Sequence, residues 1–311
     1  MIGVFPILCC VLCVICLNSI SQSEALPQNG KVAVSRVYNK LRQQRCGDLS
    51  SLIPAQRLRR RITGGRKSSL LSQPWMAFLY LPDDNEMCRC GGSLISERFV
   101  LTAAHCNRMC GRKDDLRVRL GEQDLNTELD CTTFDYKKVC APPVEEFSIE
   151  EWIVHENFDR NSGWNDIALI RLNRRAVLKD HIRPICLPLT DDLLARTSVI
   201  GQSYWAVGWG TDKDEGLANS TMEVSINTEE CLHGRDETFL CADGTYVDTC
   251  FGDSGGPLTW SVRYFSSVRV VLFGVVSVGS QECGEGRGSY YMNVPTFMPW
   301  ILEKLSGYSD L

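Results

Sequence analysis

The residues with the clearest chemical potential lie near the C-terminal end of the chain, where Ser254 follows Asp253 and precedes two glycines. A serine hydroxyl is a weak nucleophile that becomes reactive when a neighbouring base takes its proton. Glycines beside it permit a tight turn and let backbone N–H groups face a developing oxyanion. The sequence GDSGG would also fit an ordinary surface loop, so its interpretation depends on a base and an acid elsewhere in the chain.

Two upstream motifs supply these partners. His105 closes the sequence LTAAH, and Asp166 opens the apolar run DIALI. An imidazole can take the proton of a serine, and an aspartate can hold that imidazole in the required tautomer. The order His, Asp, Ser is that of the chymotrypsin fold, whereas subtilisins and α/β-hydrolases use other orders. We therefore predict that His105, Asp166 and Ser254 form a catalytic triad.

With these three motifs, the chain resembles the trypsin/chymotrypsin family of serine endopeptidases over about residues 62–305. In pattern it is most similar to the protease domains of arthropod clip-domain proteases, because it has an extra cysteine pair in the long loop 122–146. The resemblance implies an all-β fold of two six-stranded antiparallel barrels with a C-terminal helix, and a triad in the cleft between the barrels. No clip domain is expected, because residues 26–61 hold one cysteine rather than six.

The hydrophobic pattern agrees with an all-β fold, since short apolar or alternating runs recur between turn signals. These runs are residues 76–81, 93–102, 116–120, 167–172, 204–209, 222–226 and 268–278. Helical spacing is found only near residues 295–305, where Phe297, Trp300, Ile301 and Leu305 can share a face. A hinge between the barrels is expected near residues 184–188.

The resemblance also assigns residues that bind the substrate. The backbone N–H groups of Gly252 and Ser254 would hold the oxyanion. Asp248, six residues before Ser254, would lie at the base of the primary pocket and pair with an arginine or lysine of the substrate. Gly279 and Gly288 would keep this pocket open. These assignments predict an endopeptidase that cleaves after arginine or lysine.

The basic run RLRRR ends at Arg61, directly before Ile62. By the resemblance, a cut after Arg61 frees the α-ammonium of Ile62, which pairs with Asp253 and organises the oxyanion hole. A buried carboxylate requires such a partner. The chain is therefore predicted to be a zymogen with a propeptide at residues 26–61 and a protease domain at residues 62–311. The arginine at the cut requires an upstream protease of trypsin-like specificity, or the enzyme itself.

The N-terminal residues predict export. An apolar run from Ile2 to Ile20 indicates a signal peptide, residues 1–25, that is cleaved near Ala25. An uncleaved membrane anchor is the alternative, and the absence of a basic cluster directly after the run disfavours it. Sixteen cysteines suit an oxidising, extracellular setting, and a net charge of −5 gives no reason to expect a nucleic-acid partner. We expect a secreted protein with no membrane attachment after signal cleavage.

Four cysteines lie in the predicted signal peptide, and the remaining twelve form an even number that can pair completely. The resemblance implies the bridges Cys46–Cys186, Cys90–Cys106, Cys231–Cys241 and Cys250–Cys283. The Cys46–Cys186 bridge would keep the propeptide attached after cleavage.

The spacing of the other four cysteines suggests two more bridges. Cys88 alternates with Cys90 on one strand face, and Cys110 follows Cys106 by four residues, as on one helical face, so a Cys88–Cys110 bridge is geometrically sensible. A Cys131–Cys140 bridge would then close a small loop. Metal binding by these four cysteines is the alternative, and an oxidising compartment disfavours it.

Two weaker signals concern the surface. Asn219 opens the glycosylation acceptor NST. The acidic loop 122–146 lies where some relatives bind Ca²⁺, with Glu122 and Glu145 as the candidate ligands. A solvated acidic loop is the more common explanation, and no other cofactor is expected.

Together these features predict a secreted zymogen of a trypsin-like endopeptidase in an extracellular proteolytic cascade, of the arthropod immunity, melanisation or clotting type. Its expected partners are protein substrates, an upstream activating protease and serpin-type inhibitors. A non-catalytic homologue that acts as a cofactor is one alternative, and the intact triad disfavours it. A digestive trypsin is the other, and the tethered propeptide and extra bridges weigh against it.

Overall fold

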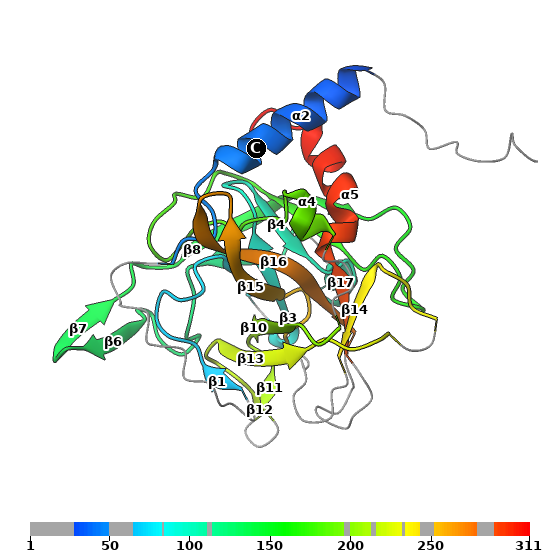
Figure 1. Ribbon diagram of the computed structural model, residues 1–311. Coiled ribbons are helices and arrows are strands. Elements are labelled where there is room, and N and C mark those ends of the chain that lie inside the picture. The colour runs from blue at the N-terminus through cyan, green and yellow to red at the C-terminus, as the bar shows by residue number, and fades with distance from the viewer. Residues whose placement is uncertain are drawn as a thin grey trace, which may run out of the picture.

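The computed structural model describes residues 28–49, 65–82, 84–110, 114–195, 200–212, 216–231, 234–242, 252–278 and 289–311. Two β units form the body of the protein, and two helices lie against one another on one side of it (Figure 1). No helix within these ranges is long and apolar enough to cross a membrane. The predicted signal peptide lies outside them.

The first unit is a closed barrel of six strands in the order β2-β3-β4-β9-β8-β5. Its strands are β2 (Met76–Leu81), β3 (Asp84–Leu94), β4 (Phe99–Thr102), β5 (Arg117–Leu120), β8 (Glu145–Val154) and β9 (Ala168–Leu172). Closure removes the exposed strand edges that an open sheet would present. The interior is apolar because β2, β4 and β9 are buried over nearly their whole length. This confirms the first of the two predicted barrels.

The second unit is a sheet of seven strands in the order β1-β13-β10-β15-β16-β17-β14. Its strands are β1 (Arg66–Lys67), β13 (Met222–Asn227), β10 (Ser203–Gly208), β15 (Pro257–Tyr264), β16 (Ser267–Val278), β17 (Ser289–Asn293) and β14 (Phe239–Ala242). Within the described residues this sheet is a half-barrel and does not close. A second β unit is therefore present as predicted, but within the described residues it is an open half-barrel and not a closed barrel. Six of its strands correspond to the six predicted strands, and the short β1 is an additional one.

Most of the apolar runs coincide with strands, but residues 93–102 do not form one strand. The chain reverses between β3 and β4, and the N–H of Ile95 donates to the carbonyl of Phe99 at 2.9 Å. The reversal occurs at the polar residues Ser96, Glu97 and Arg98, which do not continue the apolar pattern. It allows β3 and β4 to pair side by side in the barrel.

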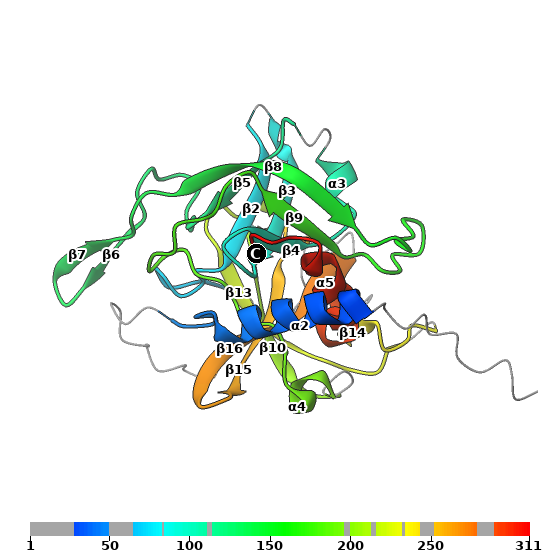
Figure 2. The same ribbon diagram turned by 90° about the horizontal axis from the view of Figure 1, so that it is seen from above.

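The C-terminal helix α5 (Val294–Ser306) is present as predicted, but the expectation of a single helical region is wrong. Residues Gln28–Gln43 form the helix α2, and the short helices α3 (Cys106–Met109) and α4 (Asp191–Leu194) lie within the protease region. The stripe that α2 buries consists of Val37 and Leu41, four residues apart, as helical packing requires. Both views show α2 against α5 (Figures 1 and 2).

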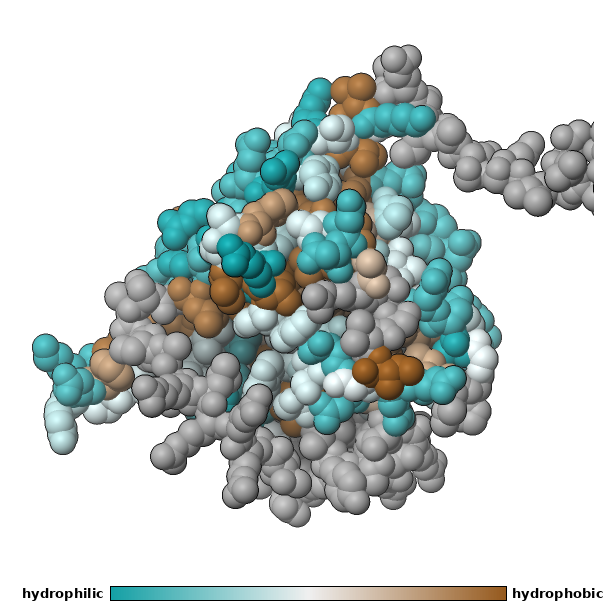
Figure 3. Space-filling model, viewed as in Figure 1, coloured by the Kyte–Doolittle hydropathy of each residue, from teal (hydrophilic) through white to brown (hydrophobic). Residues whose placement is uncertain are grey.

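A small hairpin of β6 (Cys131–Phe134) and β7 (Lys137–Cys140) projects away from the body (Figure 2). Its turn is formed by Asp135 and Tyr136, both at positive φ, and Tyr136 is fully exposed. The space-filling view shows hydrophilic side chains over much of this projecting end (Figure 3). A second small pair, β11 (Thr211–Asp212) and β12 (Gly216–Leu217), lies beside β13 (Figure 1).

Candidate active site

His105 and Asp166 come together because β4 and β9 are neighbours. Thr102 at the end of β4 pairs with Ala168 at the start of β9, so the residues just outside this pair face one another. Asp166 Oδ1 accepts the backbone N–H of His105 at 2.8 Å, and Asp166 Oδ2 lies 2.7 Å from His105 Nδ1. The Asp166 side chain is 1% exposed and the imidazole is 25% exposed. The carboxylate therefore fixes a ring that still reaches solvent.

Ser277 provides a further contact that the motifs did not indicate. It lies in β16 of the second sheet, and its hydroxyl donates to Asp166 Oδ2 at 2.6 Å. The only sequence signal was a buried serine within the apolar strand VVLFGVVSV, and such a position requires a hydrogen-bond partner. Both β units thus hold the same carboxylate.

Backbone hydrogen bonds hold the loop around Ser254 to both β units. The N–H of Gly91 in β3 donates to the Ser254 carbonyl at 2.6 Å, and the N–H of Gly255 donates to Val276 at 2.8 Å. Gly252 and Gly255 have positive φ values of 98° and 79°. A Cβ atom on Gly255 would lie 2.4 Å from the Gly91 carbonyl oxygen, so only glycine fits this approach.

His105 and the backbone of Ser254 contact the same sulfur atom, that of Cys106. The sulfur of Cys106 lies 3.8 Å from His105 Nε2 and 3.8 Å from the Ser254 carbonyl oxygen. Within the described residues the Ser254 hydroxyl makes no hydrogen bond, so the proton-transfer contact is not yet formed. Such contacts often tighten only when substrate is bound. The structure thus shows the contact between His105 and Asp166 directly, and relates Ser254 to His105 through the Cys106 sulfur that both contact.

Asp253 lies against a second pair of glycines. Its Oδ1 accepts the N–H of Gly210 at 2.8 Å, and a Cβ atom on either Gly208 or Gly210 would lie within 2.3 Å of a carboxylate oxygen. These glycines flank Trp209, and the motif search did not single them out. They leave room for the carboxylate that is predicted to receive the new N-terminus.

Other predicted site residues lie outside the described residues, so their placement is not described. They are Arg61 and Ile62 of the activation site, Asp248, Gly279 and Gly288 of the predicted pocket, and the Cys250–Cys283 bridge.

Five of the six predicted disulfides are present. They are Cys46–Cys186, Cys88–Cys110, Cys90–Cys106, Cys131–Cys140 and Cys231–Cys241. Metal binding by the four cysteines whose role was open is therefore excluded, since all four sulfurs are in disulfides. The same reason removes the cluster of Cys90, His105 and Cys106 as a metal site, although its ligand atoms lie within 4.8 Å of one another.

The carboxylates suggested for calcium already have protein partners. Glu122 is paired with Arg119 at 3.1 Å. Burial raises the pKa of the Glu122 carboxyl, and the negative charge of the nearby Asp130 raises it further. Partial burial would raise the pKa of Glu145, but hydrogen bonds from Lys179 and Arg174 outweigh this effect and lower it.

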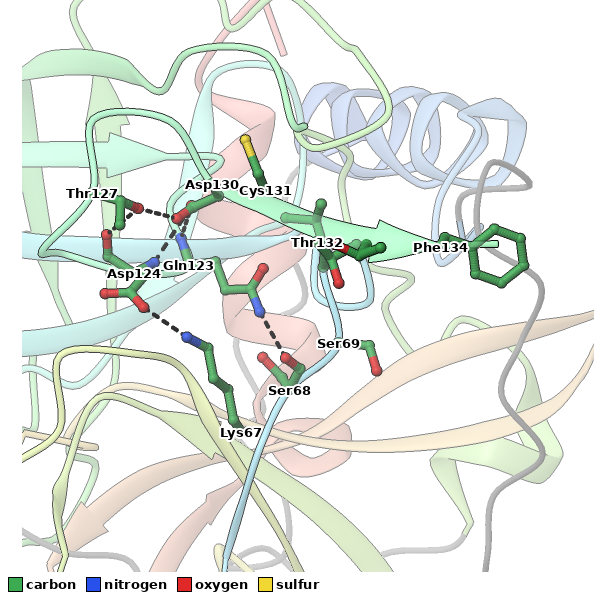
Figure 4. Close-up of a pocket in the computed structure, with 12 residues that line it drawn as sticks. Lys67, Ser68, Ser69, Gln123, Asp124, Thr127, Asp130, Cys131, Thr132 and Phe134 are labelled. Atoms are coloured by element: carbon green, nitrogen blue, oxygen red, sulfur yellow. Dashed lines mark hydrogen bonds and ion pairs between the residues drawn. The ribbon is translucent and has the colours of Figure 1, made fainter. Parts of the chain in front are cut away.

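The carboxylates of Asp124 and Asp130 in the same acidic loop also have hydrogen-bond partners within the protein. Asp124 accepts Lys67 Nζ at 2.6 Å, and Asp130 accepts the hydroxyl of Thr127 at 2.7 Å and the backbone of Gln123 at 2.9 Å (Figure 4). Calcium requires six to eight oxygen ligands. Carboxylates that are held by ammonium, guanidinium, hydroxyl and N–H groups do not fit that requirement.

The predicted glycosylation site lies between two loops. The Asn219 carbonyl accepts the N–H of Leu125 at 2.7 Å, and the Asn219 side chain is partly exposed. Ser220 donates to Asp124 at 2.7 Å, while Thr221 is buried. The residue that would carry a glycan is therefore partly exposed and lies close to the acidic loop.

Comparison with known proteins agrees with this geometry. A model of the Trypsin family matches residues 62–301. The chain is 37% identical over 262 residues to the Serine protease grass of Drosophila melanogaster, covering 80% of this chain and 69% of that protein. It is 38% identical over 264 residues to the CLIP domain-containing serine protease HP8 of Bombyx mori, covering 79% and 69%.

A third relative is the Spaetzle-processing enzyme of Drosophila melanogaster, 34% identical over 269 residues, with coverage of 79% of this chain and 66% of that protein. A crystal structure of the Drosophila Grass clip serine protease of the Toll pathway superposes with a TM-score of 0.74 and 34% identity. That superposition covers 88% of this chain and 78% of the other. The chain belongs to the trypsin family of serine proteases and is related to arthropod clip-domain proteases.

Proposed function

We propose that the protein is an endopeptidase in which Ser254 attacks the scissile carbonyl, while His105 takes the serine proton and later donates it to the leaving amine. Asp166 holds the Nδ1–H tautomer and stabilises the imidazolium. The contacts of Asp166 with His105 at 2.7 and 2.8 Å carry this proposal. Trypsin-like serine proteases perform this chemistry with their own side chains and need no cofactor.

The oxyanion of the tetrahedral intermediate is held by the backbone N–H groups of Gly252 and Ser254. Once cleavage has organised this loop, the two donors are worth roughly 3 kcal/mol each. Asp248, Gly279 and Gly288 form the pocket for an arginine or lysine, and this assignment rests on the fixed offset of six residues between Asp248 and Ser254.

The enzyme is made as a secreted zymogen and is activated by cleavage after Arg61. Two observations support this: five disulfides require an oxidising compartment, and the glycines around Asp253 leave its carboxylate room to receive the ammonium of Ile62. The relatives include the Spaetzle-processing enzyme, whose name refers to processing, and Phenoloxidase-activating factor 3 of Holotrichia diomphalia, whose name refers to activation. We assign this chain to an extracellular cascade of the same type, with protein substrates, an upstream activator, serpin-type inhibitors and a glycan on Asn219.

The test is hydrolysis of small ester and p-nitroanilide substrates by the chain after cleavage at Arg61. Arginine and lysine substrates should be turned over, and glycine substrates should not. The Ser254→Ala variant, cleaved in the same way, is the matched control and should be inactive. If the cleaved chain hydrolyses no substrate, the non-catalytic homologue becomes the correct interpretation.

A further inference from the structure

The helix α2, which precedes the proposed cleavage site, carries basic side chains and no acidic ones. Residues 28–49 contain five arginines and lysines and a single acid, Asp48, although the whole chain has a net charge of −5. Asp48 lies beyond the end of α2 and is paired with Arg45 and Arg269. The positive charge is therefore a local property of this helix and not of the protein as a whole.

The cations of α2 are free to bind a partner. Lys31, Arg36, Lys40 and Arg42 are all exposed. Within the described residues, none of these four side chains forms an ion pair or a hydrogen bond. Arg42 lies over the Phe265 ring at 4.9 Å, a contact that orients its guanidinium group without neutralising the charge.

The four cations border the outer face of α2. Lys31 and Arg42 are separated by close to three helical turns and lie on one edge of that face. Arg36 and Lys40, one turn apart, lie on the other edge. The opposite side of the helix is its buried apolar stripe. In both views, nothing in the described chain covers the outer face (Figures 1 and 2).

This charge pattern differs from that of a helix face that is only solvated. Such faces usually carry charges of both signs, because opposite charges three or four residues apart stabilise a helix. Arg36 and Lys40 instead place two like charges four residues apart, which destabilises it. An anionic partner would relieve this repulsion, so the composition of α2 favours binding of a polyanion.

An anionic polymer fits this surface better than a membrane does. A helix that lies on a lipid surface inserts its apolar face into the bilayer, but in α2 that face is buried against the protein. The polar residues Ser35 and Asn39 are exposed between the two basic edges. Guanidinium and ammonium groups bind anionic oxygens through charge-assisted hydrogen bonds, and such groups can be supplied by a polymer that stays in water.

We propose that the outer face of α2 binds an extracellular anionic polysaccharide that carries sulfate or carboxylate groups. The Cys46–Cys186 bridge joins the segment just after α2 to the protease body. Figure 2 shows α2 apart from α3, which begins directly after His105. A polymer on α2 would therefore leave His105 accessible. It would also retain the activated enzyme, a consequence that rests on the cleavage after Arg61 proposed above, whereas the binding itself does not.

The test measures binding of the full, uncleaved chain to immobilised dextran sulfate, alginate and neutral dextran. The Ser254→Ala background is used, so the result does not depend on peptidase activity. We expect binding to at least one of the two charged polymers and none to dextran. With four cationic contacts, the Kd should rise about a hundredfold as the salt concentration increases from about 50 to about 200 mM. The net charge of −5 means that overall attraction cannot produce this result.

Two double variants with the same change of charge locate the site. Arg36→Gln with Lys40→Gln removes one basic edge and should weaken binding about tenfold. Glutamine is a good helix former, so α2 should persist. Lys137→Gln with Lys138→Gln, both exposed on β7, is the matched control and should bind as the parent chain does. Thermal unfolding of both variants checks that the fold is retained.

A second α2 variant, Lys31→Gln with Arg42→Gln, repeats the measurement on the other edge and should also weaken binding. Absence of binding to both charged polymers would overturn the proposal, as would an equal loss in the α2 variants and in the β7 control. Anionic phosphatidylserine vesicles are the last comparison. If they bind more tightly than either polymer and the α2 variants abolish that binding, the outer face of α2 is a membrane site and the polysaccharide is refuted.

Discussion

Asp166 shows how a buried charge is accommodated at this site. Its carboxylate accepts three hydrogen bonds, from the backbone and the imidazole of His105 and from the hydroxyl of Ser277, while only 1% of the side chain is exposed. A buried carboxylate without such donors would be strongly destabilising. Because one of the three donors comes from the second sheet, the position of the imidazole depends on how the two β units are packed.

The first prediction separates the orienting acid from the residue that positions it. Asp166→Asn should lower kcat by about 10⁴-fold, because the amide favours the wrong imidazole tautomer. Ser277→Ala removes one of three hydrogen bonds and should lower kcat about tenfold with little change in KM. Steady-state kinetics on an arginine p-nitroanilide measure both, with Ser261→Ala on the exposed face of β15 as the control. A Ser277→Ala variant that loses stability but keeps its kcat would assign Ser277 to packing alone.

The second prediction concerns the proposed specificity residue. Asp248→Ser should lower kcat/KM for arginine and lysine substrates by several orders of magnitude, because a guanidinium bound without its carboxylate costs several kcal/mol. Hydrolysis of small apolar substrates should persist. Parallel assays on both substrate types provide the measurement. An equal loss on all substrates would mean that Asp248 supports the fold rather than the pocket.

Among the helices, α5 is fixed by polar contacts at its exposed face as well as by its apolar stripe. Glu156, just after β8, accepts the indole N–H of Trp300 at 2.9 Å and pairs with Lys304. Partial burial would raise the pKa of Glu156, but the hydrogen bonds from Lys304 and Trp300 outweigh this and lower it to about 2. These contacts tie the helix to the first barrel.

The third prediction follows from that pKa. A carboxylate with a depressed pKa in the folded state contributes stability above its unfolded pKa, and this contribution is lost as pH falls through the folded pKa. Glu156→Gln should therefore lower the free energy of unfolding at pH 6, by less than about 1 kcal/mol because the pair is largely exposed. The difference should disappear near pH 2. Urea unfolding of the inactive Ser254→Ala background at several pH values measures it.

Glu303→Gln on the same helix is the control, since Glu303 is exposed and no ion pair within the described residues involves it. A pH-independent effect of Glu156→Gln would show that the loss comes from packing and not from the charged hydrogen bonds.

At the scale of the whole molecule, the segment before the proposed cut is part of the protease body. Cys46 is bonded to Cys186, and the backbone of Gly47 hydrogen-bonds to Pro184 at 2.9 Å and to Val270 at 3.1 Å. Gly47 has a φ of 60°, and a Cβ atom there would lie 2.3 Å from the Val270 carbonyl oxygen. A glycine is therefore required for this close approach. The buried Leu41 adds apolar contact between α2 and the rest of the protein.

The fourth prediction uses this attachment. Cleavage after Arg61 should give a protein that runs as one species without reductant and as two chains with it. Only this cut should produce activity, because a chain beginning at Arg61 places its ammonium one residue too early to reach Asp253. Arg61→Gln should be secreted and folded but inactive. Gel electrophoresis, N-terminal sequencing and the p-nitroanilide assay test this, and full activity in uncleaved Arg61→Gln would contradict the zymogen mechanism.

Residue type and spacing determined much about this protein. His105, Asp166 and Ser254 were recognisable because each lies in a short motif, and their order is specific to one fold. Cys88 could be paired with Cys110 because alternation along a strand and periodicity along a helix place them beside Cys90 and Cys106, and Cys131 and Cys140 were then the remaining pair. Strands such as β2 and β16 were evident because apolar residues repeat locally.

Other features depend on contacts between distant segments, and only the tertiary structure decided them. Ser277 reaches Asp166 across 111 residues, and Gly210 reaches Asp253 across 43, so no local pattern marks either role. The helix α2 was missed because its buried stripe is only Val37 and Leu41, and its packing partner α5 lies at the other end of the chain. Local pattern identifies the reacting groups, whereas the packing of the two β units decides what surrounds them.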